Sequence, residues 1–439
     1  MKNIKKKVGF ISLGCDKNRV DLEKIIHGFK KKGYEITNDE NLANVIVINT
    51  CGFISDAKRE SIDAVIHAGT LKQNKNLECL AVCGCLVNNM NENELKKELP
   101  EVDVWVNIAS KTDVISAVEN FLNKSKLQNK KTVQERILTT PNHFAYLKIA
   151  DGCNNFCTYC LIPKIKGPFK SEKMSLLIKE AKGLVKKGVK ELILVAQDTT
   201  KYGTDLNKKT NIITLLDQLE KIDGLEKIKL LYCYPDNISD ELIKKIKTSK
   251  KICHYIDMPL QHASDSVLKA MNRHTSKEQI ENIILKLKKE IPDIAIRTTF
   301  IIGFPGETKK DIVNLCEFLK KHNLQNVGFF KYSREKNTPA DLLDGHIPEK
   351  EKTARLKKVQ AVQSKIMEVN LKKRHGKIYD VFVDDITEKT AICHGDFEVP
   401  GIDCPILIPA FSGNVGDKVK IIVIDSTKTE LIGKIINVK

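Results

Sequence analysis

The chain has 439 residues, of which 41% are hydrophobic and 29% are charged, and its formal net charge is +17. This length is too great for one ordinary core and suggests roughly two to four domains. No apolar run approaches the roughly 18–20 residues of a membrane-spanning helix, so we expect a cytoplasmic protein without a membrane segment. The positive charge allows nucleic-acid binding, but the lysines are scattered along helix faces, which is equally typical of a lysine-rich proteome.

The first 122 residues alternate between short apolar runs and helix-length segments. This alternation is typical of a parallel, doubly wound sheet with helices on both faces. Strands are expected at 8–14, 45–50, 77–84 and 102–106, with an amphipathic helix at 18–32. Residues 123–134 have no such periodicity and are expected to form a linker.

The alternation resumes from residue 140 to residue 345, with six expected strands. Six βα units with short connections would form a partial (βα)6 barrel rather than a closed one, with its chemistry at the carboxyl ends of the strands. The strands are expected at 146–150, 191–197, 228–234, 254–260, 295–302 and 327–332.

The end of the chain has a different pattern. A basic helix is expected at 349–374, and residues 372–439 contain short strands separated by turns, which predicts a small all-β barrel of oligonucleotide-binding type. Its five strands are expected at 377–383, 391–397, 403–408, 418–424 and 431–437. Residues 375–439 carry seven lysines against ten carboxylates, a net charge of −3 in a basic chain.

The most specific motif in the chain is a cysteine loop. The chain has thirteen cysteines, and an odd number cannot all pair in internal disulfides. Clustered cysteines in a reducing compartment favour metal binding. Cys153, Cys157 and Cys160 are spaced C-x3-C-x2-C directly after an expected strand. Three thiolates on one loop can bind three irons of a [4Fe–4S] cluster and leave the fourth iron open to S-adenosylmethionine (SAM). The alternative is a zinc site completed by His143 or His262.

A second set of cysteines is dispersed along the chain. Cys15, Cys51 and Cys85 each follow an expected strand of the first region, and a glycine stands next to each of them. The carboxyl ends of parallel strands form a ligand crevice, so these cysteines could hold a second cluster with an open iron. The alternative is that each is a small buried hydrophobic side chain.

Long ordered segments of the sequence match a known family. The segments are 12–21, 49–54, 150–160, 196–203, 258–262, 271–273, 298–308 and 329–334. They are spread over essentially the whole chain. The sequence resembles the methylthiotransferases, and within them the ribosomal protein S12 methylthiotransferase family.

The resemblance implies a three-domain enzyme: an N-terminal methylthiotransferase domain (1–122), a radical SAM domain (140–345) and a C-terminal TRAM domain (372–439). Members of the family add a methylthio group to the β-carbon of an aspartate in S12. The cluster of the C-x3-C-x2-C loop would cleave SAM to a 5′-deoxyadenosyl radical, the other cluster would hold or donate the sulfur, and a second SAM would supply the methyl group. An electron donor and a sulfur source are implied as partners, with the ribosome as a further candidate.

Four further residues are expected to contact the cofactor. Tyr159 would pack near the adenine of SAM, Gln197 and Asp198 would approach its amino group, and Arg297 would hold a carboxylate or ribose. Ordinary packing or surface roles are the alternatives for these side chains.

The tRNA-modifying branch of the methylthiotransferases has the same two clusters and is the main alternative in function. The acidic C-terminal region favours a basic ribosomal protein over a phosphate backbone as the substrate. A non-catalytic, cysteine-rich protein that binds zinc or RNA is the alternative from another class.

Overall fold

The computed structural model describes residues 5–74, 76–107, 113–123 and 135–436. Most of the expected linker, residues 124–134, lies outside this described part. The chain divides into two units by its contacts. The first unit comprises Met1–Thr139, Ala150–Gly183 and Ser333–Asp341, and the second comprises Thr140–Ile149, Leu184–Tyr332 and Leu342–Lys439.

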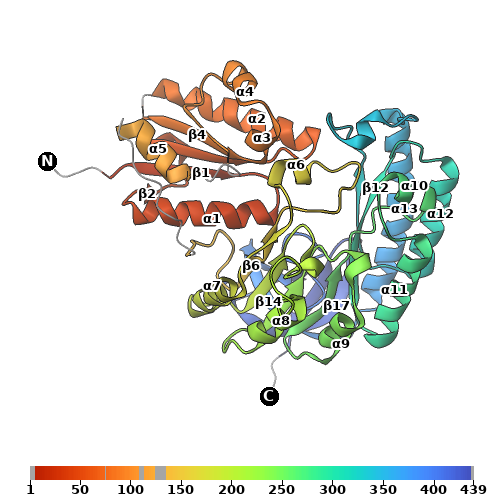
Figure 1. Cartoon of the computed structure of the whole chain (residues 1–439). Coiled ribbons are helices and arrows are strands. Elements are labelled where there is room, and N and C mark those ends of the chain that lie inside the picture. Colours follow the sequence, from red (N-terminus) through yellow and green to blue (C-terminus); the bar gives the residue numbers. More distant parts are fainter. Residues whose placement is uncertain (1–4, 75, 108–112, 124–134, 437–439) are drawn as a thin grey trace. The chain divides into compact units, whose positions relative to one another are not determined.

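The first unit is built on a parallel five-stranded sheet in the order β2-β1-β3-β4-β5 (Figure 1). Its strands are β1 (Lys7–Ser12), β2 (Glu35–Ile36), β3 (Val45–Thr50), β4 (Cys79–Gly84) and β5 (Val104–Val106). Every residue of β3 and β4 is buried, because both faces of the sheet are covered by helices. The expected doubly wound sheet is confirmed, and only the two-residue strand β2 was not anticipated.

Two helical layers enclose this sheet. The helices are α1 (Asp16–Lys31), α2 (Ser55–Thr70), α3 (Cys85–Asn89), α4 (Glu92–Glu98) and α5 (Val114–Asn123). Helices α1 and α5 cover one face, where Phe29 and Val118 pack on Val47. Helices α2, α3 and α4 cover the other face, where Val65 and Val87 join the same core cluster as Ile48 (Figure 1).

The remaining segments of the first unit surround the C-x3-C-x2-C loop. They contain the short antiparallel ribbon β7 (Ala150–Asp151) and β8 (Lys170–Ser171), helix α6 (Ile162–Lys166) and the start of α7 (Met174–Lys186). Arg136 is 1% exposed, and its guanidinium lies 2.8 Å from Glu23 of α1 and 3.1 Å from Glu180 of α7. This buried network of ion pairs joins the segment before Phe144 to α1 and α7.

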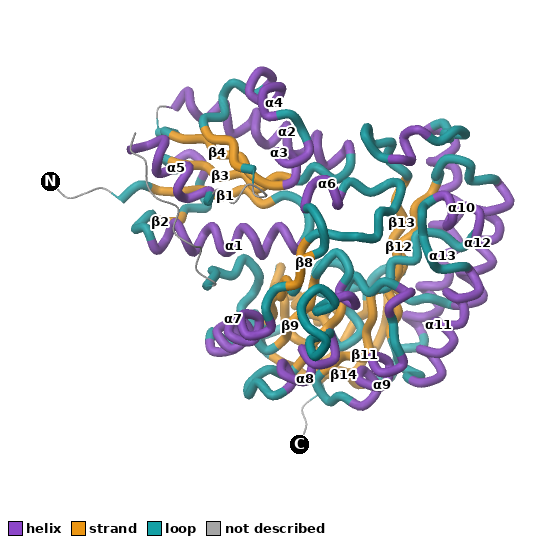
Figure 2. The backbone as a smooth tube through the Cα atoms, viewed as in Figure 1, coloured by secondary structure: helices purple, strands orange, loops and turns teal. Residues whose placement is uncertain are grey.

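The second unit contains a six-stranded, parallel sheet in the order β13-β12-β11-β10-β9-β6 (Figure 2). Its strands are β6 (Phe144–Lys148), β9 (Glu191–Val195), β10 (Lys227–Leu230), β11 (Ile252–Asp257), β12 (Ala295–Ile302) and β13 (Asn326–Lys331). The intervening helices are α8 (Ile212–Glu220), α9 (Asp240–Thr248), α10 (Asp265–Ala270), α11 (Lys277–Glu290) and α12 (Lys309–His322). The two outer strands, β6 and β13, do not pair with each other, so the expected partial barrel is confirmed.

Helix α13 (Glu349–Lys372) leads from this sheet into a closed, five-stranded barrel in the order β14-β15-β16-β18-β17. Its strands are β14 (Ile378–Thr387), β15 (Thr390–His394), β16 (Ile406–Ile408), β17 (Lys418–Ser426) and β18 (Leu431–Ile435). The barrel interior is filled by apolar side chains such as Val381, Val423 and Leu431. The small C-terminal β-barrel is therefore confirmed, although residue 437 of its last expected strand lies outside the described residues. Among the described helices, none has the length and apolar character needed to cross a membrane.

Candidate functional site

The strand order of the first sheet defines where its ligand crevice lies. In an open, doubly wound sheet of order 2-1-3-4-5, that crevice is at the carboxyl ends of β1 and β3, where the connections diverge. Cys15 follows β1 and is the N-cap of α1, Cys51 follows β3, and Cys85 follows β4 as the first residue of α3. The three predicted ligands are therefore at the same edge of three neighbouring strands.

Two glycines allow the cysteine loops to touch. A Cβ atom added at Gly14 would lie 3.0 Å from the Cβ of Cys51 and 3.2 Å from its Sγ. A Cβ atom added at Gly52 would lie 2.7 Å from the Cα of Leu86 and 2.8 Å from the carbonyl carbon of Cys85. Since real Cβ atoms do not approach backbone this closely, Gly52 is required for the contact between the loops of Cys51 and Cys85.

Asn18 is a residue of this site that sequence reasoning did not single out. Its side chain is 1% exposed, and its amide nitrogen donates hydrogen bonds to the carbonyls of Leu13 (3.4 Å) and Thr50 (3.2 Å). The thiol of Cys85 donates to Asn18 Oδ1 over 3.7 Å. Asn18 thereby joins the loops after β1, β3 and β4. The signal in the sequence was a polar residue in the first turn of the helix that follows Cys15.

Burial controls the protonation of these thiols. Burial raises the pKa of Cys51, and the nearby Cys15 raises it further. Burial likewise raises the pKa of Cys85 to about 11, and both other cysteines of the trio add to the rise. Because a metal ligand must be the thiolate, iron binding by this trio would release the thiol protons.

The C-x3-C-x2-C loop closes on itself. The backbone N–H of Cys153 donates to the carbonyl of Gly167 over 3.2 Å, and Gly152 has a φ of +74° with no room for a side chain against Pro168. Two backbone N–H groups point at sulfur: Asn155 at Cys153 (3.5 Å) and Ile162 at Cys160 (3.4 Å). Such donors stabilise thiolate charge.

The two cysteine trios lie in the same unit and are joined by contacts. Helix α6, which follows Cys160, packs on α3, which begins at Cys85: Leu161 and Ile165 form one buried cluster with Cys85. The side-chain amide of Asn88 in α3 donates a 3.0 Å hydrogen bond to the carbonyl of Ile165. The sequence predicted both trios but not this connection between them.

A returning segment, Ser333–Asp341, contacts the start of α2, which follows Cys51, and the C-x3-C-x2-C loop. Glu335 is 2% exposed and accepts hydrogen bonds from the backbone N–H (2.7 Å) and the hydroxyl (2.9 Å) of Ser55, at the start of α2. It also forms an ion pair with Lys58. The N–H of Ala340 donates to the carbonyl of Thr158, between Cys157 and Cys160, over 2.9 Å.

The spacing of the sulfurs tests what each trio can bind. Two sulfurs on one zinc ion lie at most about 4.6 Å apart, since each Zn–S bond is about 2.3 Å. Within the described ranges, the one group of three His, Cys, Asp or Glu ligand atoms that all lie within 4.8 Å of one another is His143, Asp384 and His394. Among the described residues, neither cysteine trio is so compact.

The two histidines considered as zinc ligands are engaged elsewhere, in the second unit. His143 Nε2 lies 2.8 Å from Asp384 Oδ1, and His262 Nε2 lies 3.4 Å from Glu307 Oε2. The interpretation of the C-x3-C-x2-C loop as a zinc site completed by either histidine therefore has no support from these contacts.

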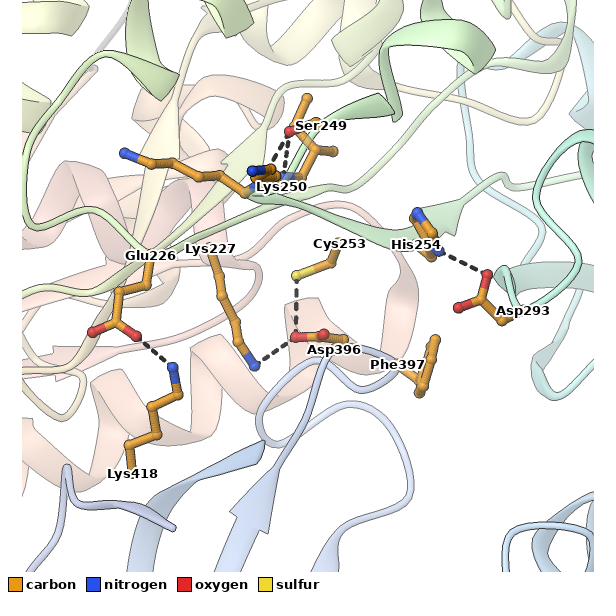
Figure 3. A pocket seen from close by; sticks show the side chains of 12 residues that line it. Glu226, Lys227, Ser249, Lys250, Cys253, His254, Asp293, Asp396, Phe397 and Lys418 are labelled. Carbon is orange, nitrogen blue, oxygen red and sulfur yellow. Dashed lines mark hydrogen bonds and ion pairs between the residues drawn. The ribbon is translucent and has the colours of Figure 1, made fainter. Parts of the chain in front are cut away.

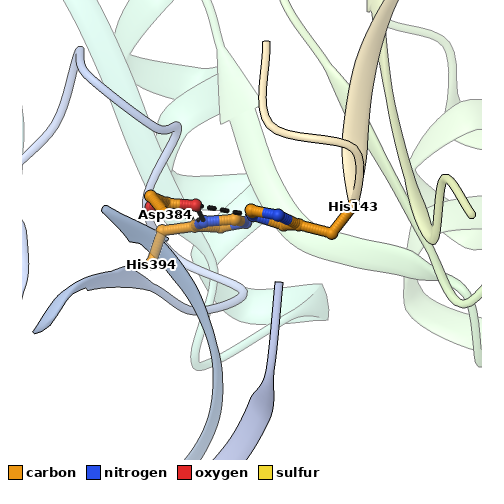
Figure 4. A group of neighbouring side chains, drawn as sticks. All are labelled: His143, Asp384 and His394. Carbon is orange, nitrogen blue, oxygen red and sulfur yellow. Dashed lines mark hydrogen bonds and ion pairs between the residues drawn. The ribbon is translucent and has the colours of Figure 1, made fainter. Parts of the chain in front are cut away.

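Figure 4 shows that His143, Asp384 and His394 form a chain of hydrogen bonds. His394 Nδ1 lies 2.7 Å from Asp384 Oδ1, and its Nε2 lies 3.1 Å from Glu191 Oε2, which in turn pairs with Lys229 at 2.9 Å. Burial alone would lower the pKa of His394, but Glu191 and Asp384 raise it above its ordinary value. The carboxylate at each ring nitrogen favours the charged form of His394, and these contacts join the C-terminal barrel to the parallel sheet.

The residues predicted to contact SAM are placed differently from one another. Tyr159 is half-buried in the turn before Cys160, and Gln197 is half-buried after β9. Asp198 is fully buried, and its two carboxylate oxygens accept hydrogen bonds from Thr200 (2.5 Å) and Asn237 (3.2 Å). Asp198 thus joins the turns after β9 and β10.

Arg297 also pairs with carboxylates of the second unit. It is the third residue of the eight-residue strand β12, and its guanidinium lies 2.9 Å from Asp257 and 3.4 Å from Asp403 of the C-terminal barrel. Both carboxylates raise the pKa of Arg297 despite its burial. An arginine paired with two carboxylates stabilises the join between sheet and barrel. The sequence could not show that Asp403 would lie against it.

A hollow of about 320 Å³ lies elsewhere in the second unit. Its lining includes Lys227 and Ile252, which begin β10 and β11, together with Lys418 at the start of β17 (Figure 3). Figure 3 also shows Asp396 between the ammonium group of Lys227 (2.5 Å) and the thiol of Cys253 (3.7 Å). The amino ends of barrel strands serve stability rather than catalysis, so this hollow is not the active site.

Comparisons with known proteins agree with the fold and with the cysteine loops. Residues 147–319 match the model of the Radical SAM superfamily, and residues 7–107 match the model of the Uncharacterized protein family UPF0004. Among solved structures, the radical SAM methyltransferase TsrM from Kitasatospora setae is similar with a TM-score of 0.56 at 11% identity, covering 76% of this chain and 75% of that chain. The cobalamin-dependent radical enzyme OxsB is similar with a TM-score of 0.52 at 12% identity, covering 82% and 56%. The matched family and the fold define a radical SAM protein.

Curated relatives narrow this class. The ribosomal protein uS12 methylthiotransferase RimO of Clostridium botulinum is 44% identical over 438 residues, which cover 98% of each chain. The protein of the same name from Alkaliphilus oremlandii is 46% identical over 382 residues, which cover 87% of each chain. The chain belongs to the family of ribosomal protein uS12 methylthiotransferases, as the resemblance of its motifs indicated. It is a radical SAM methylthiotransferase whose cofactors are SAM and [4Fe–4S] clusters.

Proposed function

We propose that this enzyme transfers a methylthio group to the β-carbon of an aspartate in ribosomal protein uS12. The proposal rests on the names of relatives that align over nearly the whole chain. The structural observation that carries it is the contact of α3 with α6, which holds the two cysteine trios together in one unit. Hydrogen abstraction and sulfur delivery must converge on one carbon, and adjacent cluster loops satisfy this requirement.

The two trios have separate proposed roles. Cys153, Cys157 and Cys160 would hold the cluster that binds SAM, and Cys15, Cys51 and Cys85 would hold the cluster at which sulfur is carried. When bound, these groups supply the one-electron and sulfur chemistry that no side chain provides. The chain itself supplies three thiolates to each cluster and leaves one iron open.

We also propose contacts and partners around these clusters. Tyr159, next to Cys160, would pack against the adenine of SAM, and Gln197 would approach its amino group. The reaction consumes electrons and sulfur, so an electron donor and a sulfur source are required partners, in the cytosol where ribosomal proteins are made. The net charge of −3 in residues 375–439 supports a basic protein as the substrate.

The test is a pair of triple variants of the full chain, purified and reconstituted without air. The wild-type protein should hold about eight irons and each triple variant, Cys153/Cys157/Cys160→Ala or Cys15/Cys51/Cys85→Ala, about four. The first variant should lose SAM cleavage, while the second should cleave SAM but add no sulfur. Cys316→Ala, which removes a buried cysteine of α12, is the matched control and should behave as wild type.

The substrate is tested with the same preparations. Wild-type enzyme given SAM, sulfide and a chemical reductant should add about 46 Da, one sulfur and one CH2, to uS12. The same mass added to tRNA and not to uS12 would place the enzyme in the tRNA-modifying branch. Bound zinc without iron or labile sulfide in air-free protein would overturn the enzymatic function altogether.

A further inference from the structure

A buried lysine stands between the loops of the two trios. Lys166 ends α6, and its side chain is 6% exposed. Its Nζ lies 3.5 Å from Asp21 Oδ2 in α1, the helix that begins after Cys15. It also lies 3.9 Å from Asp151 Oδ2, two residues before Cys153. The ammonium group of Lys166 therefore interacts with one carboxylate in the helix after Cys15 and one just before Cys153.

The same cation acts on the N-terminal trio. Lys166 directly follows Ile165, which forms one buried cluster with Cys85. The packing of Ile165 on Cys85 explains this reach, because it holds the end of α6 against the start of α3. A helix that belongs to one trio thus carries a positive charge to the other.

We propose that Lys166 is a positioning residue that sets the reduction potential of the cluster held by Cys15, Cys51 and Cys85. The inference rests on the proposed function, since it assumes that this trio binds a cluster. A cluster gains one negative charge on reduction, and a nearby buried cation stabilises that charge more than it would in water. The carboxylate of Asp21 next to Lys166 offsets part of this effect. The two residues should therefore act in opposite directions.

The test uses the full chain with Cys153, Cys157 and Cys160 replaced by alanine, so that a single cluster remains. In this background, Lys166→Met should lower the ratio of reduced to oxidised cluster at fixed potential roughly tenfold, which is about 59 mV for one electron. Lys166→Arg keeps the charge and should stay near the parent. Lys164→Met removes an exposed lysine from the same helix and should change nothing. A spectroscopic redox titration measures each ratio.

Asp21→Asn provides the second arm. Removing this carboxylate should raise the proportion of reduced cluster, whereas structural damage would shift both variants in the same direction. Potentials of Lys166→Met and Asp21→Asn that equal the parent, or move together, would overturn the inference. Should Lys166→Met hold no iron, a failure of Asp21→Asn to raise the potential would overturn it alone. Absence of iron from the parent triple variant would instead refute the cluster assignment of the proposed function, and this inference with it.

Discussion

The amide of Asn88 reaches the carbonyl of Ile165 at 3.0 Å, which links the helix that starts at Cys85 to the helix that follows Cys160. This bond crosses 77 residues of sequence. This hydrogen bond and the packing of Leu161 and Ile165 on Cys85 connect the two cysteine trios directly. Helices α3 and α6 have five residues each, which is too short for either to be stable alone, so each helix depends on the other.

Replacing Asn88 with alanine should therefore loosen α3 from α6. The lost hydrogen bond should lower the free energy of unfolding by about 1 kcal/mol. Urea unfolding of the apoprotein measures this change, and Asn93→Ala, at an exposed position of α4, is the control. Equal stabilities of the two variants would show that the contact contributes nothing.

Gly52→Ala should remove the N-terminal cluster selectively. The new Cβ would meet the backbone of Cys85 and Leu86 at 2.7–2.8 Å, so α3 and its cysteine must move. The iron content after anaerobic reconstitution should fall from about eight to about four per chain. Gly183→Ala, where a Cβ meets nothing within 4 Å, should keep the full content. Full iron in Gly52→Ala would contradict the role of the close approach.

The charge chain through His394 should make the second unit sensitive to alkaline pH. Asp384 and Glu191 raise the pKa of His394 above its ordinary value of 6.5, against the effect of burial. A raised pKa in the folded state contributes stability that is fully present below pH 6.5 and is lost as the pH rises through the folded-state pKa. The free energy of unfolding should therefore decrease over this range in the wild type.

His394→Gln should abolish most of that dependence and cost roughly 3 kcal/mol at about pH 6, because it removes one cation that two buried carboxylates share. Unfolding by urea at a series of pH values measures both effects. His375→Gln, at an exposed histidine before β14, should retain the wild-type profile. An unaltered slope in His394→Gln would refute the imidazolium assignment.

Glu335 should anchor the returning segment in a pH-dependent manner. Burial would raise the pKa of Glu335, but Lys58 and the hydroxyls of Ser333 and Ser55 lower it below its ordinary value of 4.5. Its contribution is therefore present above pH 4.5 and is lost as the pH falls through the lowered pKa. Glu335→Gln should cost about 1–3 kcal/mol near pH 7 and almost nothing in acid.

Proteolysis provides a local measurement of this anchor. The peptide bonds of Ser333–Asp341 should be cut faster in Glu335→Gln at neutral pH than in the wild type or in Glu388→Gln, at an exposed turn position. If cleavage of this segment is as slow in Glu335→Gln as in the wild type, the anchor lies elsewhere.

Local patterns were sufficient to predict most of the fold. β3 (Val45–Thr50) and β12 (Ala295–Ile302) begin and end where expected, because both are short runs rich in β-branched residues. The cysteines followed from the same reasoning, since a residue directly after a parallel strand lies at the carboxyl edge of the sheet. The sequence thus predicts one trio from the spacing of its cysteines and the other from their places after strands.

Pairings between distant segments could not be predicted. Asp403 on Arg297, Asn237 on Asp198, and Asn88 on Ile165 each join residues that no local pattern relates. Side-chain roles at a site depend on which partner arrives from another part of the chain, and a periodicity carries no information about that partner.

The first unit is assembled from three stretches of chain, the last of which ends at Asp341. During synthesis, the sheet that carries Cys15, Cys51 and Cys85 leaves the ribosome long before Ser333–Asp341 does. A nascent chain can fold its sheet early, yet the buried site of Glu335 stays unfilled until more than three quarters of the protein has been translated. The cysteines of both trios are therefore synthesised well before the segment that contacts their loops. A fragment that ends before Ser333 lacks part of the unit that would hold iron and sulfide.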